Sequence, residues 1–161
     1  ASWVSPGGHA ILVPEVVAGP DGPAVRASWL YDVATRGGRE LPPMVDAVWS
    51  PDGARLAWVE AGVLLARHVP TGRVAVLAPT GAAGGGRLTW SPDGRWLLYA
   101  GAFGDLWLAR ADATSGTVRV ADSVAWEPVG PTWAPGSDRF AVTVRDSDGT
   151  TRLVVADLPA R

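Results

Sequence analysis

Trp49-Ser50-Pro51-Asp52-Gly53 is the stretch of this 161-residue chain that decides its fold, because the chain repeats it. The same five residues return at 90–94, and a degenerate copy, Trp-Ala-Pro-Gly-Ser, stands at 133–137. A fainter copy, Val-Ser-Pro-Gly-Gly at 4–8, follows Trp3. The prolines of the four copies, at 6, 51, 92 and 135, are 45, 41 and 43 residues apart. A period in the low forties predicts a repeat architecture built from one supersecondary unit. The repeat-motif residues are Trp49, Pro51, Asp52, Gly53, Trp90, Pro92, Asp93, Gly94, Trp133 and Pro135.

The Ser-Pro-Asp-Gly part of the motif has the residues that a type I turn requires. Proline presets φ at the second position, aspartate suits the third, and glycine accepts a left-handed conformation at the fourth. A short apolar run follows each turn, and its side chains alternate with a period of two, which predicts a strand. The matched pairs in these runs are Ile11 and Val13, Leu56 and Trp58, Leu97 and Tyr99, and Phe140 and Val142.

The repeats span approximately residues 1–43, 44–85, 86–124 and 125–161, and each reads as an antiparallel meander of short strands. The second repeat is the clearest, with strands expected at 45–49, 55–60, 63–68 and 73–77. The third repeat follows the same plan, with Leu108-Ala109-Arg110 aligned to Leu65-Ala66-Arg67. The fourth repeat supplies strands at 129–133, 139–145 and 151–157. Because no segment has a sustained apolar period of 3.6 residues, we expect very little helix.

These features predict an all-β fold, a β-propeller of four-stranded antiparallel blades with four repeats present. A propeller ring closes when strands from both ends of the chain share one blade. This sequence starts on an inner strand and ends on a third strand, so it lacks the spare outer strand. Three arrangements remain open: a closed four-blade ring, half of an eight-blade ring made by two chains, and a fragment of a larger propeller.

Composition excludes several classes of partner. Hydrophobic residues make up 47% and charged residues 19% of the chain, which is typical of a globular protein. With a net charge of −2 and no run of like charges, the chain lacks the basic stripe that nucleic acid binding requires. No apolar stretch approaches the ~20 residues of a membrane-spanning helix, so we expect no membrane insertion by this segment. The absence of cysteine excludes disulfides and thiolate chemistry.

No motif predicts catalysis, a cofactor or a metal. The two histidines, His9 and His68, have no carboxylate at metal-ligand spacing. There is no Gly-x-Ser-x-Gly elbow of the serine hydrolases. The glycine-rich segment 81–86 lacks the Lys-Ser/Thr of a phosphate loop and precedes an expected strand. We therefore expect a protein that is not an enzyme, with no catalytic, cofactor-binding or metal-binding residues.

The motif followed by Arg-Leu-Ala-Trp at 55–58 or Arg-Trp-Leu-Leu-Tyr at 95–99 resembles the WD-like repeat of TolB-type bacterial β-propellers. The resemblance covers nearly the whole chain, with two close repeats and two degenerate ones. It implies that the tryptophan ends the innermost strand of each blade, that the ring serves as a binding surface or gate, and that the location is periplasmic or otherwise extracytoplasmic. The chain departs from the family where Gly7 and Gly136 replace the aspartate, and TolB-type rings typically have more blades than four.

The expected function is that of a non-catalytic scaffold that binds a protein or peptide through the loops between blades, which line one mouth of the ring. Aromatic residues and arginine are the enriched anchors of such interfaces. The candidate contact residues are Trp126 and Glu127 in one connection between blades, Arg87 in the equivalent connection, and Phe103 in a hairpin. The alternatives are an accessory or gating propeller of an enzyme such as a prolyl-oligopeptidase-type peptidase, a lyase with its site in the channel, and a structural unit that associates only with itself.

Overall fold

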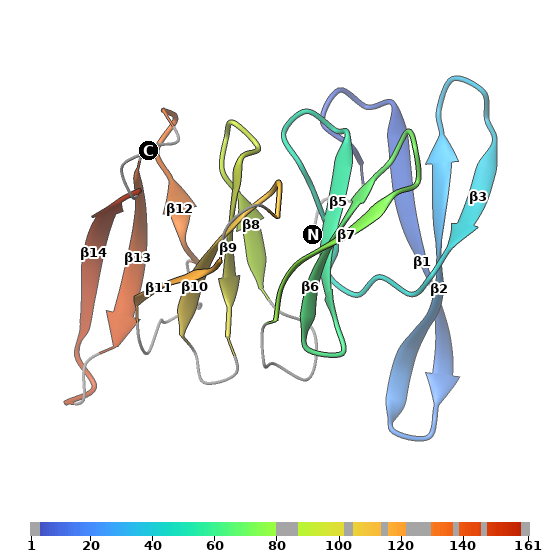
Figure 1. Cartoon of the computed structure of the whole chain (residues 1–161). Helices are drawn as coiled ribbons and strands as arrows, with labels where there is room; N and C mark the ends of the chain where they lie inside the picture. The colour runs from blue at the N-terminus through green and yellow to red at the C-terminus, as the bar shows by residue number, and fades with distance from the viewer. Residues whose placement is uncertain are drawn as a thin grey trace.

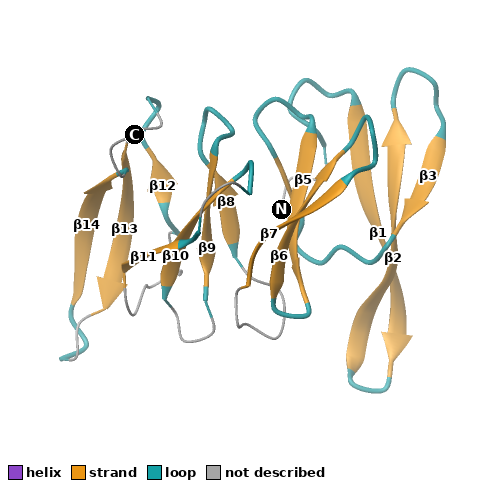
Figure 2. Cartoon of the chain, viewed as in Figure 1, coloured by secondary structure: helices purple, strands orange, loops and turns teal. Residues whose placement is uncertain are grey.

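A computed structural model of the chain describes residues 4–79, 87–101, 105–113, 116–121, 130–136, 139–145 and 148–158. These residues form fourteen strands and no helix (Figure 2). The strands make four antiparallel sheets that follow one another along the sequence, as expected for an all-β propeller (Figure 1).

Each sheet is a meander of consecutive strands. The first sheet contains β1 (Ala10–Gly19), β2 (Gly22–Asp32) and β3 (Gly38–Leu41). The second contains β4 (Val48–Trp49), β5 (Arg55–Glu60), β6 (Val63–His68) and β7 (Val74–Pro79). The third contains β8 (Leu88–Trp90), β9 (Trp96–Ala100), β10 (Leu106–Arg110) and β11 (Val118–Ala121). The fourth contains β12 (Thr132–Trp133), β13 (Arg139–Arg145) and β14 (Thr151–Asp157).

The motif turn has the backbone geometry that its residues require. In the second repeat the Gly53 amide donates to the Ser50 carbonyl at 2.9 Å, and the Ser50 amide donates to the Arg55 carbonyl at 2.9 Å. Gly53 has a φ of 67°, in the left-handed region that glycine adopts without steric cost. The third repeat reproduces this turn, with Gly94 at a φ of 68° and its amide 2.9 Å from the Ser91 carbonyl.

The serine and aspartate side chains of the motif stabilise the turn by hydrogen bonds to its own backbone and to each other. The Ser50 side chain is fully buried, and its Oγ accepts a hydrogen bond from the Arg55 amide at 2.8 Å while donating to Asp52 Oδ1. Asp52 Oδ1 also accepts the Ala54 amide at 2.9 Å. Burial raises the pKa of the Asp52 carboxyl, but the hydrogen bonds from Ser50 and Ala54 and the charge of Arg55 outweigh it, so the net pKa is lowered. The turn therefore favours the ionised form of Asp52.

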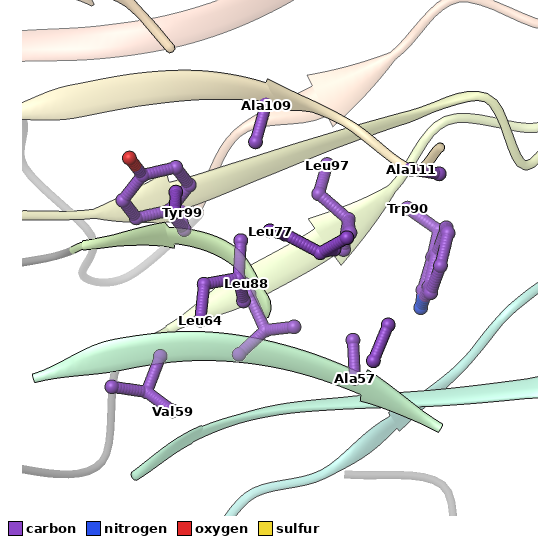
Figure 3. Packing of buried hydrophobic residues seen from close by; sticks show 12 residues of the cluster. Ala57, Val59, Leu64, Leu77, Leu88, Trp90, Leu97, Tyr99, Ala109 and Ala111 are labelled. Atoms are coloured by element: carbon purple, nitrogen blue, oxygen red, sulfur yellow. The ribbon is translucent and has the colours of Figure 1, made fainter. Parts of the chain in front are cut away.

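Within the described ranges, three separate apolar clusters hold the sheets to one another. The first lies between the first and second sheets and contains Leu12, Leu30 and Leu56. The second lies between the second and third sheets, where Leu64, Leu97 and Tyr99 meet (Figure 3). The third joins the third and fourth sheets around Leu98, Leu106, Leu108, Phe140, Val142 and Val144. Burial of such side chains stabilises the fold by roughly 1.5–3 kcal/mol each.

The motif tryptophans contribute to these contacts. Trp49 and Trp90 are 8% and 7% exposed, and each belongs to the cluster between its own sheet and the preceding one. The Trp90 Nε1 donates to the Val48 carbonyl of the second sheet at 3.2 Å. The Trp90 indole thus links β8, the inner strand of the third sheet, to β4, the inner strand of the second. Trp133 is partly buried and stacks edge-on with Phe140 at 5.4 Å between ring centroids.

The four sheets stand in a row, with the first and last at opposite ends (Figure 1). Among the described residues, no apolar cluster joins the first sheet to the fourth. A closed four-blade ring would bring these two sheets into contact. The row therefore has the form of a segment of a propeller, which fits half of a larger ring or a fragment of one.

Candidate functional site between the first two sheets

The fourth residue after each motif proline occupies a recurrent position at the edge of the gap between neighbouring sheets, which we call the stitch position. In the first three repeats its side chain lies on the strand face that packs against the next sheet, because the residue two places further on belongs to that interface. The residues at the stitch position are Ala10, Arg55, Trp96 and Arg139.

Arg55 binds the second sheet to the third. Its Nη1 donates to the Ala111 carbonyl at 3.3 Å and its Nη2 to the Gly94 carbonyl at 3.2 Å. The guanidinium carbon also lies 5.2 Å from the centroid of the Trp90 ring, within the range of a cation–π contact. One side chain thus spans the gap by three contacts with the neighbouring repeat.

The carbonyl that Arg55 contacts has an equivalent in the second repeat. The Ala111 amide donates to the Arg95 carbonyl and the Val69 amide to the Ala54 carbonyl, so Ala111 and Val69 occupy the same place in their repeats. The Arg39 Nη2 of the first sheet donates to the Val69 carbonyl. An arginine of the preceding sheet therefore reaches this carbonyl at both gaps, from β3 at the first and from β5 at the second.

The expected alignment of Leu65-Ala66-Arg67 with Leu108-Ala109-Arg110 is wrong by one residue. Leu56 and Leu97 are equivalent in the repeat, and they pair with Arg67 and Ala109. The β5–β6 hairpin turns through two residues, with Glu60 paired to Val63, whereas β9 and β10 begin their pairing at Ala100 and Leu106. The different hairpin lengths shift the two third strands relative to each other.

A cleft of about 500 Å³ opens between the first and second sheets, where the stitch position holds Ala10. Leu30, Val69 and Pro70 provide apolar surface, and Asp32, Thr35 and Arg39 provide polar groups. The equivalent cleft between the second and third sheets measures about 340 Å³, and Arg55 forms part of its wall. The small side chain of Ala10 is thus associated with the larger of these two clefts.

Two arginines give this first gap a cationic character. Leu30 pairs with Arg39 and Leu56 pairs with Arg67, and both leucines belong to the cluster between the first two sheets. Arg39 and Arg67 therefore face the same gap from opposite sides. Burial lowers the pKa of the Arg67 guanidinium, and the charge of Arg39 lowers it further. The Arg67 Nε is buried without a hydrogen-bond partner in the described structure.

Asp32 contributes an acidic group to the lining of the cleft. Its Oδ1 accepts the Thr35 amide at 2.7 Å and the Thr35 hydroxyl at 2.9 Å. These bonds from Thr35 lower the pKa of the Asp32 carboxyl. The turn that carries them includes Arg36 at a φ of 56°. The lining of the cleft thus combines an apolar surface with the Asp32 carboxylate and the Arg39 guanidinium, and Arg67 faces the same gap from the second sheet.

Of the contact residues expected from the sequence, the structure describes Arg87. It is exposed and precedes β8, at the end of that strand away from the motif turn, and its carbonyl accepts the Ala100 amide at 2.9 Å. Both clefts lie at the motif-turn end, and Arg87 lines neither. Trp126, Glu127 and Phe103 lie outside the described residues. The stitch position could have been found in the sequence by aligning the prolines, but the cleft beside it could not.

Within the described ranges, no group of three or more histidine, aspartate or glutamate side chains is placed to hold a metal ion. The His68 Nδ1 lies 2.8 Å from the Thr71 hydroxyl, in a hairpin turn. The part of the chain that the structure describes contains no helix with the length and apolarity to cross a bilayer.

Solved structures with the same arrangement are β-propellers. A chain assigned as TolB from Agrobacterium tumefaciens aligns with 96% of this chain and 60% of its own, at 22% identity and a TM-score of 0.61. The β-propeller domain of the Trilobed protease from Pyrococcus furiosus aligns with 95% of this chain and 53% of its own, at 14% identity and a TM-score of 0.66. The acylaminoacyl peptidase from Pyrococcus horikoshii aligns with 94% of this chain and 30% of its own, at 11% identity and a TM-score of 0.66.

No family model matches the sequence, and no curated protein matches it. The likeness to solved structures establishes the fold, which is that of the β-propellers. The TolB-like character expected from the Trp-Ser-Pro-Asp-Gly repeats is confirmed at the level of the fold. The chain spans 60% or less of the length of each of these three structures.

Proposed function

We propose that this chain is a non-catalytic scaffold that binds a segment of a partner protein in the cleft between its first two sheets. The observation that carries the proposal is the contrast between two equivalent gaps. Arg55 occupies one of them, whereas Ala10 leaves the other with about 500 Å³ of space. Clefts of this size, with an apolar surface and a few polar groups, are typical binding sites.

The charges in the cleft indicate the chemistry of the segment. Arg39 and Arg67 face the gap from both sheets, and a guanidinium recognises a carboxylate through paired hydrogen bonds. Leu30, Val69 and Pro70 offer contacts to an apolar side chain. We expect a ligand segment that places a carboxylate beside an apolar residue, such as a protein C-terminus.

The proposed setting is the bacterial cell envelope, outside the cytoplasmic membrane. It is supported by the Trp-Ser-Pro-Asp-Gly repeats that the chain shares in kind with TolB-type propellers and by the fold likeness to the Agrobacterium tumefaciens chain. Fractionation of the native cells, followed by immunoblotting for the protein in each fraction, tests this setting. Detection of the protein outside the cytoplasmic membrane is the expected result.

The binding proposal is tested by selecting peptides from a random-sequence phage library on the immobilised chain. The strongest peptide is then synthesised with a fluorophore and titrated by anisotropy. Ala10→Arg places at the first gap the side chain that Arg55 places at the second, and we expect it to weaken binding about 10-fold or more. Ala75→Arg adds the same group at an exposed position in the second cleft and should leave the affinity unchanged.

The same titration separates the cleft from the mouth of the propeller. Trp126→Ala and Phe103→Ala remove the aromatic anchors expected from the sequence. If they abolish binding while Ala10→Arg does not, the scaffold role stands and the cleft is the wrong site. If the library yields no specific peptide, the scaffold proposal itself fails.

A second candidate is an accessory propeller of a larger enzyme. Two of the similar structures belong to a protease and a peptidase, and this chain covers 30% of the second one. Mass spectrometry of the native protein would detect a hydrolase domain on the same polypeptide. Its presence would favour the accessory role, and a native polypeptide made of propeller repeats alone would exclude it.

A further inference from the structure

We propose that two copies of this chain associate head to tail, with the outer face of the last sheet of one copy packed on the outer face of the first sheet of the other. The outer face of the first sheet consists of Ile11, Val13, Trp29 and Tyr31. The outer face of the last sheet consists of Arg139, Ala141, Leu153 and Val155. Of these residues only Tyr31 also lines the cleft between the first two sheets, and the proposal does not depend on the proposed function.

Strand register defines both faces. In the first sheet Leu12 pairs with Leu30, and both side chains pack toward the second sheet. The neighbouring pairs, Ile11 with Tyr31 and Val13 with Trp29, therefore lie on the opposite side. In the last sheet Phe140 and Val142 pack toward the third sheet, so the pairs Ala141 with Val155 and Thr143 with Leu153 lie on the outer side.

Both outer faces expose apolar side chains to water, which is unfavourable unless another surface covers them. Leu153 and Val155 are 70% and 61% exposed, and Val13 and Tyr31 are each 41% exposed. Trp29 stacks with Tyr31 at 6.4 Å between ring centroids, so two aromatic rings lie together on the face of the first sheet. Uncovered apolar patches of this kind mark interaction surfaces.

The chain itself shows what covers such faces. Ile11 has the same place in the repeat as Leu56, Leu97 and Phe140, which are 0–2% exposed because the preceding sheet covers them. Ala141 has the same place as Ala57 and Leu98, which the following sheet covers. The outer face of the last sheet thus corresponds to surfaces that pack on a following sheet, and the first sheet of a second copy offers the corresponding receiving surface.

The two outer faces also carry equivalents of the polar groups that connect the second and third sheets. Arg139 stands at the stitch position, as Arg55 does. In the structure Arg139 contacts Asp157 at 3.3 Å, with the two side chains 55% and 76% exposed, which is a weak ion pair. Val33 is the equivalent of Val69 and Ala111, because its amide donates to the His9 carbonyl at 2.9 Å. In the proposed contact Arg139 of one copy donates to the Val33 carbonyl of the other.

The two outer faces carry opposite charges at the end of the sheets that is remote from the motif turn. Glu15 lies on the outer face of the first sheet, where its carboxylate binds Arg26 at 2.9 Å and Trp29 Nε1 at 3.3 Å. Arg145 lies at the C-terminal end of β13, two residues beyond Thr143 on the outer face of the last sheet. Both residues lie toward the ends of their strands that are remote from the motif turn, so head-to-tail packing places the two opposite charges at the same end of the interface. A contact of this kind closes a ring of two copies if the rotation allows it.

Sedimentation velocity of the whole chain, from low micromolar to about 100 µM, tests the association. We expect a reversible dimer. Leu153→Asp and Val13→Asp each place a charge on one of the two faces, and each variant alone should remain monomeric. Val76→Asp changes a valine that is 64% exposed and belongs to neither face, so its dimerisation should equal that of the unchanged chain.

Mixing the two monomeric variants gives the decisive result. The Val13→Asp chain keeps the face of its last sheet and the Leu153→Asp chain keeps the face of its first, so the mixture should form a one-to-one complex through one intact interface. Arg139→Ala should weaken the dimer about 5-fold while the circular dichroism spectrum stays unchanged. A chain that is monomeric throughout the range, association that Leu153→Asp does not reduce, or a mixture that remains monomeric would each overturn the proposal.

Discussion

Replacement of Arg55 by alanine should loosen the second sheet from the third. The substitution removes two hydrogen bonds from a charged donor, at 3.3 and 3.2 Å, and the contact with the Trp90 ring. Because the side chain is partly exposed and the bonds are long, each contributes about 0.5–1 kcal/mol, and the ring contact contributes a similar amount. The expected loss in the free energy of unfolding is therefore about 2 kcal/mol.

The chain supplies a matched control for this experiment. Arg139 occupies the same position in the fourth repeat, but its contact is an exposed ion pair with Asp157. Arg139→Ala should cost about 0.5 kcal/mol or less. Both variants are measured by urea denaturation followed by tryptophan fluorescence, at about 0.5 µM protein so that association between copies does not contribute.

The conservative variant separates charge from geometry. Arg55→Lys retains the cation but cannot reach two carbonyls and lie over the ring together, so we expect it to recover less than half of the loss. The reasoning is refuted if Arg55→Ala and Arg139→Ala lower the free energy of unfolding equally, or if Arg55→Lys is as stable as the unchanged chain.

Three further outcomes follow from the motif turn. Ser50→Ala leaves a buried backbone amide without its hydroxyl acceptor and should lower the free energy of unfolding by about 1–3 kcal/mol in a urea titration; a loss that vanishes within error would show that the hydroxyl is dispensable. Gly53→Ala should cost more than Gly149→Ala, because both have positive φ but only the first would place a Cβ 3.1 Å from a carbonyl oxygen of the preceding repeat, and equal melting temperatures would contradict this. The lowered pKa values of Asp52 and Asp93 mean that their stabilisation is fully present above the ordinary aspartate pKa of about 3.9 and is lost as the pH falls through the folded-state values; Asp93→Asn should therefore flatten the fall in stability below about pH 4.

Much of the fold follows from the repeated turn. The expected strands at 55–60, 63–68, 139–145 and 151–157 coincide with β5, β6, β13 and β14. Serine, proline, aspartate and glycine fix the local backbone, and the alternating side chains that follow fix which face is buried. These signals are local, so the sequence carries them without reference to the rest of the chain.

Other features depend on contacts that the sequence does not display. The expected inner strand at 45–49 is shorter in the structure, as β4 covers Val48–Trp49, and Asp46 takes a φ of 53° before it. The hairpin of β1 and β2 runs from Ala10 to Asp32 and contains a bulge between Glu15 and Val16. Tertiary packing decides these boundaries, because Met44 and Ala47 are buried against the first sheet and the chain must turn to place them there.

The candidate site likewise combines features that the sequence predicts with features that depend on tertiary contacts. The stitch position is visible in the sequence once the prolines are aligned, and the difference between Ala10 and Arg55 is plain there. The partners of Arg55 are backbone carbonyls, which every residue possesses, so no sequence pattern distinguishes Gly94 and Ala111 as acceptors. The cleft and its facing arginines depend on strand register across two repeats, and this register changes with hairpin length.

The three apolar clusters have a consequence for how the chain loses structure. Among the described residues, the apolar clusters join each sheet to its immediate neighbours alone, so the free energy of unfolding resembles a sum of nearest-neighbour terms. The middle sheets are held from both sides and the outer ones from a single side. Opening should begin at the periphery and advance inward, and amide hydrogens of β9 should outlast those of β14 in deuterium exchange. A substitution at Phe140 would then release the last sheet while leaving the first two intact.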